Sequence, residues 1–178
     1  MIKTLKTQEI YKNKWIRLRE DSILRESGEV GIYSVVEKED FVIVLAVEDE
    51  FIYVVKQYRY PIGQYTIELP QGAWETQVGA DPLEVAQGEL KEETGLTAAE
   101  MTYIGYQKLA NGLTNQGYSI FIAKGLTQGE TQLDSEEFGL TTQKVLRTTF
   151  EQWLMDGTII DASTSNAYLL AQFKGYLK

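Results

Sequence analysis

The segment that most constrains this chain runs from Asp81 to Gly95, because it holds a helix start, a helix stop and clustered acids. Asp81 is a good N-cap, Pro82 suits the first helical position, and Glu84 completes a capping box. Gly95 stops the helix as a left-handed cap, so we predict a helix that ends at Thr94. Any fold for this chain must therefore accommodate a short helix with a strongly acidic side.

The predicted helix carries an acidic arc beside an apolar stripe. At about 100° per residue, one stripe contains the apolar side chains Leu83, Ala86 and Leu90. Glu89, Glu92 and Glu93 share the adjoining arc, whereas Lys91 points to the far side. Glu89 and Glu93 are a like-charge i,i+4 pair, which costs ~0.2–0.5 kcal/mol in water. Such a cluster suits a hard divalent cation, since Mg²⁺ binds carboxylate oxygens. The alternative is a solvated acidic face, because charged residues are common on helix surfaces.

The residues around this helix resemble the Nudix box. The family pattern is Gly, five residues, Glu, seven residues, then Arg-Glu-apolar-x-Glu-Glu-x-Gly-apolar. The sequence matches this pattern at Gly72, Glu89, Leu90, Glu92, Glu93, Gly95 and Leu96. The resemblance implies an α/β fold, namely the Nudix α/β/α sandwich with a mixed central sheet. It also implies metal-dependent hydrolysis of a diphosphate linkage.

The sequence departs from the Nudix pattern in two places. Gly72 and Glu89 are seventeen positions apart where the pattern has fifteen, so the loop Glu has no clean counterpart and Glu75 and Asp81 are the nearest acids. Gly88 stands where the family has an Arg that helps to orient the carboxylates. A glycine inside a helix also costs ~1 kcal/mol relative to alanine. Both departures concern the reaction rate more than the fold.

Composition narrows the chemistry and the partners. The 178 residues include no cysteine and no histidine, which excludes a thiol nucleophile, the usual general base and the usual zinc ligands. The net charge of −9 makes a nucleic acid polymer a poor partner, whereas metal ions could bridge the chain to a small polyphosphate ester. No stretch is apolar enough to span a membrane and the N-terminus does not read as a signal peptide, so we expect a cytoplasmic protein with no membrane partner.

Residues 1–40 alternate as strands do and lack long helical periods. The stretches read as strands are 9–11, 15–20 and 30–36. They resemble the antiparallel N-terminal strands of ADP-ribose and nucleoside diphosphate sugar pyrophosphatases, which help to build a homodimer and carry aromatics that can stack on the nucleobase. The resemblance implies that Trp15, and more weakly Tyr33, binds substrate. The alternative for both is core or interface packing.

The segment before Gly72 also resembles this subgroup. Gln57-Tyr58-Arg59-Tyr60-Pro61 is similar to its Gln-aromatic-Arg-x-Pro segment, in which the Arg reaches the substrate's diphosphate or adjacent sugar. The planar fork of Arg59 suits phosphate oxygens, although a structural ion pair is the alternative. The subgroup shares a Glu at Glu68, which the resemblance makes a substrate-binding residue. The carbonyl before the Gly is a metal ligand in the subgroup, and here it belongs to Gln71.

The acidic segment Leu133-Asp134-Ser135-Glu136-Glu137-Phe138 resembles the loop that closes over the site in this subgroup. That loop supplies a catalytic base or an additional metal ligand. The resemblance makes Glu136 the first choice for this role and Glu137 the second. The alternative is a loop of solvated acids.

The remaining residues are predicted to complete one sheet and its covering helices. The stretches 41–47 and 51–58 form a buried hairpin, and two later strands are predicted at 101–106 and 117–123. In the C-terminal part, Thr148 or Thr149 is expected to cap one helix and Asp161 to begin another. We therefore expect a single domain over 1–178, in which strands 1–40 contribute to dimerisation and substrate binding and residues 41–178 form the Nudix core.

The resemblance implies a specific reaction, which is hydrolysis of a nucleoside diphosphate sugar such as ADP-ribose to a nucleoside monophosphate and a sugar phosphate. The implied cofactor is Mg²⁺, with Mn²⁺ as the alternative ion, held by the carbonyl of Gln71 and by Glu89, Glu92, Glu93 and Glu136. The acids with an implied catalytic role are Glu89, Glu92, Glu93, Glu136 and Glu137. Two alternatives stay open: a Nudix enzyme that cleaves nucleoside triphosphates or dinucleotides, and a non-catalytic Nudix-fold module that binds nucleotides.

Overall fold

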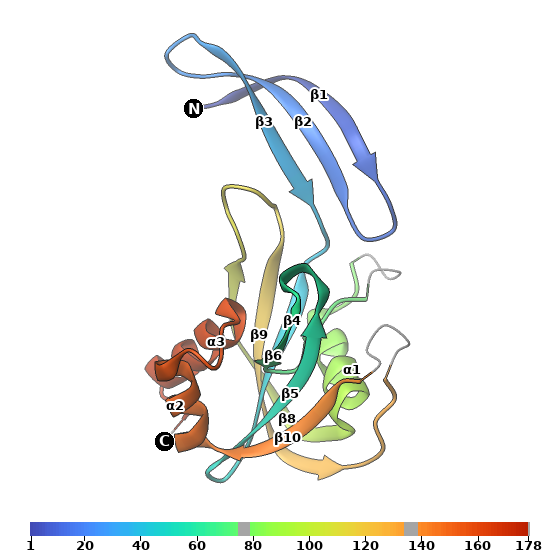
Figure 1. The fold of residues 1–178 in the computed structure, drawn as a ribbon, viewed down its shortest axis with the longest axis vertical. Helices are drawn as coiled ribbons and strands as arrows, with labels where there is room; N and C mark the ends of the chain where they lie inside the picture. The colour runs from blue at the N-terminus through green and yellow to red at the C-terminus, as the bar shows by residue number, and fades with distance from the viewer. Residues whose placement is uncertain (75–78, 134–138, 178) are drawn as a thin grey trace.

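The N-terminal residues form a separate three-stranded sheet that projects from the body of the molecule (Figure 1). The structure is a computed structural model and describes residues 1–74, 79–133 and 139–177. The sheet contains β1 (Lys3–Lys12), β2 (Arg17–Leu24) and β3 (Val30–Glu37), in that order. Both pairings are antiparallel, as the sequence predicted. Every residue of β1 is exposed, so a large part of this sheet has no cover within the chain.

The second sheet has seven strands and forms the centre of the body. Its strands are β4 (Phe41–Glu48), β5 (Phe51–Arg59), β6 (Gln64–Glu68), β7 (Gln71–Gly72), β8 (Leu96–Lys108), β9 (Gly117–Gln128) and β10 (Thr141–Leu146). The order is β10-β5-β4-β9-β8, with β6 beside β5 and β7 beside β4. β4 and β9 run parallel and the other pairs are antiparallel, which confirms the mixed sheet.

Helices cover both faces of this sheet (Figure 1). Because the side chains of a strand point alternately to its two sides, β4 contributes to an apolar cluster on each face. Three side chains of β4 belong to the apolar cluster under α1 (Pro82–Thr94): Val42, Val44 and Ala46. The two between them belong to the cluster under α2 (Arg147–Asp156) and α3 (Ala162–Phe173): Ile43 and Leu45. The predicted α/β/α sandwich is therefore confirmed.

The limits of α1 agree with the local sequence signals, but its apolar side does not. The Asp81 carboxylate accepts from the Leu83 N–H at 3.0 Å, and Gly95 closes the helix with a φ of 73°. However, Leu83 is 36% exposed, so the apolar stripe of Leu83, Ala86 and Leu90 is buried only in part. The buried apolar residues are Val85, Ala86 and Leu90. The helix is turned about its axis relative to one that buries the stripe of Leu83, Ala86 and Leu90, because Glu89 and Glu93 also lie on its buried side.

The start of α2 is a second correction. The helix begins at Arg147 without a side-chain cap, so the predicted Thr148 or Thr149 cap was wrong. Strand β10 runs directly into the helix, and the Arg147 N–H donates to the carbonyl of Glu50 at 2.7 Å. A carbonyl from the β4–β5 turn thus satisfies a main-chain donor that a cap residue would otherwise satisfy. The predicted start of α3 is confirmed, because the Asp161 carboxylate accepts from the Thr164 N–H.

Short elements account for most of what the pattern missed. The sequence predicted a β4–β5 hairpin but did not resolve β6, β7 or β10, and η1 (Tyr60–Ile62) was not expected. β7 has only two residues, too few for a periodicity to be read. Among the helices that the structure describes, none is long and apolar enough to cross a membrane.

The rotation of α1 can be tested by comparing two leucines of the same helix. Leu90→Ala should lower the free energy of unfolding by about 2–5 kcal/mol, because Leu90 is fully buried and the substitution leaves a cavity. Leu83→Ala, at a partly exposed position, should change it by about 0.5 kcal/mol or less. Urea denaturation of both variants measures the difference. Equal losses would contradict the observed orientation of the helix.

Candidate active site

A cavity of about 850 Å³ opens between α1, the ends of β5 to β7 and the start of α3. The residues that line it come from segments far apart in the sequence. All the predicted site residues of the Nudix core that the structure describes are among them: Arg59, Glu68, Gln71, Glu89, Glu92 and Glu93. The fold thus gathers at one cavity the residues that the sequence singled out separately.

The acids of α1 reach the cavity from a buried face of the helix. Glu89 is 4% exposed and Glu93 is 1% exposed, while Glu92 is half-buried. Charged side chains are almost never this buried unless they are paired. The main chain of β7 is one partner, because the Gln71 N–H donates to the Glu93 carboxylate at 3.0 Å. The solvated acidic face that was the alternative therefore does not describe Glu89 and Glu93.

Gly72 makes room for the carboxylate of Glu89. A Cβ atom on Gly72 would lie 2.3 Å from one carboxylate oxygen of Glu89 and 2.7 Å from the other. Any larger residue would push the carboxylate away from the β7 main chain. The glycine therefore lets an acid of α1 lie directly against the strand that carries the Gln71 carbonyl.

Arg59 is held in the cavity wall by Glu68. The Arg59 Nε donates to Glu68 Oε1 at 2.9 Å and Nη2 donates to Oε2, so the pair is bidentate. Burial by itself would lower the pKa of the guanidinium, but hydrogen bonding to Glu68 and the nearby charges of Glu93 and Asp161 raise the pKa above its ordinary value. The Arg59 side chain is 40% exposed, so the salt bridge leaves part of it facing the cavity.

Glu68 itself is buried and has several donors around it. Besides Arg59, the side chains that donate to its carboxylate are Gln57, Thr66 and Gln71. The same residue was predicted from resemblance to bind substrate. In the structure its carboxylate organises the cavity wall, and its contribution to substrate binding stays a prediction.

The start of α3 supports the Gln71 segment and was missed from the sequence. The Ser163 hydroxyl donates to Gln71 Oε1 at 3.0 Å, and the Leu69 N–H donates to Thr164 Oγ1 at 3.0 Å. Ser163 and Thr164 are both buried. The N-cap at Asp161 could be read locally, but no sequence signal links it to residues more than ninety positions earlier.

The donor chemistry at the cavity fits a hard divalent cation. Carboxylate and main-chain carbonyl oxygens are the ligands that Mg²⁺ uses, and the close approach of Glu89 to Gly72 sets its carboxylate beside the strand that carries the Gln71 carbonyl. Within the described ranges, however, no three acidic side chains are gathered closely enough to hold an ion by themselves. The predicted ligands also include the Gln71 carbonyl and Glu136. Glu136 and Glu137 lie outside the described residues, so their roles stay predictions.

The two aromatic candidates of the N-terminal sheet lie away from this cavity. Trp15 is 38% exposed, and the Lys14 ammonium is 4.0 Å from its ring centroid. The Tyr33 hydroxyl donates to the carbonyl of Gly112 at 3.1 Å. Neither residue is among those that line the cavity of its own chain, and their contact with substrate stays a prediction.

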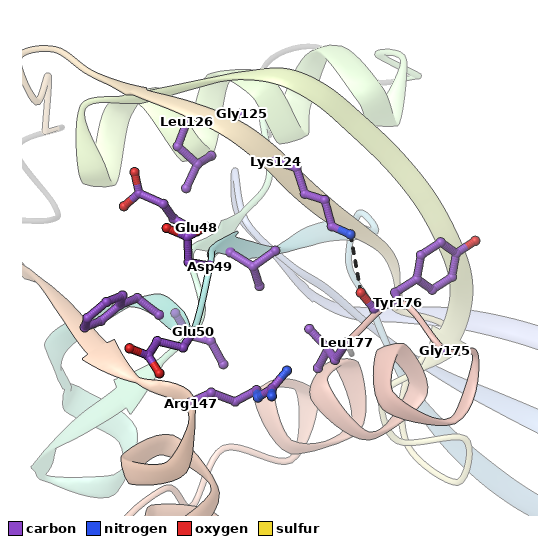
Figure 2. A pocket seen from close by; sticks show the side chains of 13 residues that line it. Glu48, Asp49, Glu50, Lys124, Gly125, Leu126, Arg147, Gly175, Tyr176 and Leu177 are labelled. Carbon is purple, nitrogen blue, oxygen red and sulfur yellow. Dashed lines mark hydrogen bonds between the residues drawn. The ribbon is translucent and has the colours of Figure 1, made fainter.

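A second cavity, of about 670 Å³, lies at the opposite end of β5 (Figure 2). Its wall mixes both charges, because the acids Glu48, Asp49 and Glu50 line it together with Lys124 and Arg147. The Lys124 ammonium donates to a main-chain carbonyl of the C-terminal segment at 3.3 Å. None of the predicted site residues that belong to the described ranges lines this cavity, so the first cavity is the candidate active site.

Comparison with known proteins agrees with this architecture. Residues 2–36 match the model of the nucleoside diphosphate sugar hydrolase N-terminal domain, and residues 37–153 match the NUDIX domain. The chain therefore belongs to the Nudix family and is a Nudix hydrolase. Within that family it carries the N-terminal domain of the nucleoside diphosphate sugar hydrolases, which confirms the resemblance seen in the sequence.

Relatives match along nearly the whole chain. The chain is 31% identical to the ADP-ribose pyrophosphatase of Bacillus subtilis (strain 168) and 30% identical to the methanol dehydrogenase activator of Bacillus methanolicus. Each match covers 99% of this chain and 95% of the relative. The crystal structure of an ADP compounds hydrolase superposes with a TM-score of 0.85 over 98% of this chain and 95% of the other. Its sequence identity is 19%, so it bears on the fold alone.

The network at Glu68 predicts a loss of stability on removal of its charge. Glu68→Gln keeps the size of the side chain but replaces charge-assisted hydrogen bonds by weaker ones, so the free energy of unfolding should fall by about 1–3 kcal/mol. Glu130→Gln, at an exposed position, is the control and should have almost no effect. Denaturant titration compares the two variants. A loss at Glu68 no larger than that at Glu130 would contradict the structural role of the network.

Proposed function

We propose that this Nudix hydrolase cleaves the diphosphate bond of a nucleoside diphosphate sugar such as ADP-ribose, giving a nucleoside monophosphate and a sugar phosphate. The observation that carries the proposal is the cavity itself, where buried acids of α1 meet the Gln71–Gly72 strand and the guanidinium of Arg59. The match of residues 2–36 and the relative named as an ADP-ribose pyrophosphatase support this substrate class.

We assign the binding of a divalent ion to Glu89, Glu92, Glu93, Glu136 and the Gln71 carbonyl, with Mg²⁺ as the first choice and Mn²⁺ as the second. Such an ion, when bound, supplies Lewis-acid stabilisation of the phosphate charge and lowers the pKa of water. Without it, three acids and a phosphate substrate would repel one another in one cavity. The acids of α1 therefore make substrate binding conditional on a cation.

The other residues bind and orient the substrate. Arg59 is placed to bind phosphate oxygens with its planar fork, and Glu68 fixes the direction of that fork. Water would add to one phosphorus as the bond to the bridging oxygen breaks, and a carboxylate would accept the proton. Glu136 is the first candidate for this base and Glu137 the second.

The N-terminal sheet is proposed to pair with a second copy of the chain. Its apolar side chains that are at least half exposed are Ile10, Tyr11, Val30 and Ile32. A sheet with so much exposed apolar surface is typical of an interaction site. In a homodimer, residues 1–40 of one copy would bring Trp15 and Tyr33 to the base of a substrate in the other copy. The proposed partners are thus a nucleotide sugar and a second chain, and the proposed compartment is the cytoplasm.

The reaction can be tested with a panel of nucleotides in Mg²⁺. Nucleoside diphosphate sugars should give a monophosphate and a sugar phosphate, and Glu93→Gln should lower kcat/KM by about two orders of magnitude or more with little change in folding. Glu84→Gln, on an exposed position of the same helix, is the matched control and should retain its activity. Product analysis by chromatography measures both.

Two outcomes of this panel would overturn the proposed function. Faster cleavage of nucleoside triphosphates or dinucleotides would assign the chain to another Nudix activity. Tight binding of nucleotide sugars without turnover at any Mg²⁺ or Mn²⁺ concentration would make it a binding module.

The homodimer has its own test. Light scattering after gel filtration should give twice the mass of one chain, and Ile32→Glu should halve this mass by placing a charge in the apolar surface. Met155→Glu, at an exposed position of α2, is the control and should stay dimeric. A wild-type chain that elutes as a monomer at micromolar concentration would contradict the proposal.

A further inference from the structure

The absence of a side chain at Gly88 is explained by Trp74. A Cβ atom on Gly88 would lie 2.3 Å from Cζ2 of the indole and 3.1 to 3.2 Å from two further ring atoms. Real Cβ atoms essentially never lie so close to a non-bonded heavy atom, so even alanine at this position must displace the indole. Glycine is otherwise unfavourable inside a helix, and Gly88 is seven positions into α1. The helix thus accepts a poor helix former at the place where Trp74 lies on it.

The indole of Trp74 also packs against the apolar core under α1. Trp74 is partly buried and packs against the apolar cluster that contains Val85 and Leu90 of α1 and Val42 of β4. It also lines the candidate active site. Trp74 therefore lies between the core under α1 and the cavity, in van der Waals contact with the helix backbone at Gly88.

The contact of Trp74 with Gly88 is of the same kind as the contact of Glu89 with Gly72. Trp74 lies two residues after Gly72 in the chain, and Gly88 lies directly before Glu89. The indole fills the space above Gly88, and the carboxylate of Glu89 fills the space above Gly72. Two neighbouring glycine contacts thus fix how the end of β7 lies along α1. The loss of either contact would allow the strand and the helix to shift against each other.

We propose that Trp74 is a positioning residue of the catalytic site: by lying on Gly88, it holds the Gln71–Gly72 main chain against the Glu89 carboxylate. Its effect on the rate rests on the proposed function, whereas its contact with Gly88 does not. The contact also accounts for the departure from the Nudix pattern at this position. The indole occupies the space that an arginine at 88 would need, so in this chain a residue from the loop side takes over the support of the carboxylates.

The contact predicts an unusual dependence between two substitutions. Gly88→Ala should lower the Tm of the wild-type chain, because the new methyl group displaces the indole. In a Trp74→Ala chain the same substitution should leave the Tm unchanged or raise it, because the space is open and alanine is the better helix former. Thermal unfolding of the four proteins without metal measures this reversal, whatever the activity.

The positioning role predicts a second set of changes. Trp74→Ala should lower kcat by about tenfold or more while KM changes less, because small shifts of catalytic groups are costly. It should also weaken the binding of Mn²⁺, measured by titration, by a similar factor. Trp74→Phe, which keeps an aromatic ring on Gly88, should recover most of both. Trp153→Phe, at a partly buried position of α2 away from the cavity, is the matched control.

These measurements distinguish three failures: that of the contact, that of the positioning role and that of the proposed function. Additive effects of Gly88→Ala and Trp74→Ala on the Tm would overturn the contact itself. The expected reversal in Tm with unchanged kcat and Mn²⁺ affinity in Trp74→Ala would overturn the positioning role, and Trp74 would be a packing residue only. A wild-type chain that cleaves no diphosphate substrate would overturn the proposed function, and the Tm reversal together with the Mn²⁺ titration would still decide the role of Trp74.

Discussion

The structure depends on two carboxylates buried one helical turn apart. Glu89 and Glu93 lie on the same face of α1, and both are almost entirely removed from solvent. Like charges this close repel each other more strongly in a protein interior than in water. A fold that keeps them there must surround them with donors or positive charge. The residues that meet this need are the ones that form the cavity.

The donors come from a short segment that is itself held from several directions. The Gln71 N–H reaches Glu93, and Gly72 makes room for Glu89. The strand β7 that carries them has two residues and pairs with β4. Beyond this ladder, the start of α3 binds the segment through Ser163 and Thr164. A pair of serine and threonine hydroxyls thus links the C-terminal helix to the segment whose Gln71 N–H reaches Glu93.

The positive charge at the cavity, the guanidinium of Arg59, is also held in place by a neighbouring strand. Arg59 at the end of β5 pairs with Gln64, whereas Glu68 at the end of β6 pairs with Val55, so the long side chain of Arg59 reaches back along the antiparallel ladder to its partner. Without Glu68 the flexible side chain of Arg59 could adopt many rotamers, whereas the bidentate contact selects one. The same contact leaves part of the guanidinium facing the cavity. An ion pair and a phosphate-binding group, which the sequence offered as alternatives for Arg59, are therefore compatible in one residue.

The parts of the fold that could be predicted from the sequence are those with local causes. Asp81 and Gly95 mark the ends of α1, and the apolar run at 41–47 marks the central strand, because caps and periodicity act between near neighbours. The orientation of Leu83 and the start of α2 could not be predicted, because packing and a distant carbonyl decide them.

The candidate site shows the same division. The glutamates of α1 followed from a spacing, but Ser163 supports Gln71 across ninety-two positions and no local pattern reports such a contact. Trp74 was missed for a related reason. Its meaning lies in its contact with a glycine fourteen positions later, which was read from the sequence only as a departure from a pattern.

The claim that the buried acids of α1 exist to bind a cation is tested most directly by thermal unfolding with and without Mn²⁺. In the absence of metal, a Glu89→Gln/Glu93→Gln chain should unfold at a higher temperature than the wild-type chain, because the repulsion is relieved. Saturating Mn²⁺ should raise the Tm of the wild-type chain by several degrees, since a ligand that binds only the folded state stabilises it, and should leave the double variant unchanged. An equal response of both chains to Mn²⁺, or a wild-type Tm that does not respond, would contradict the account.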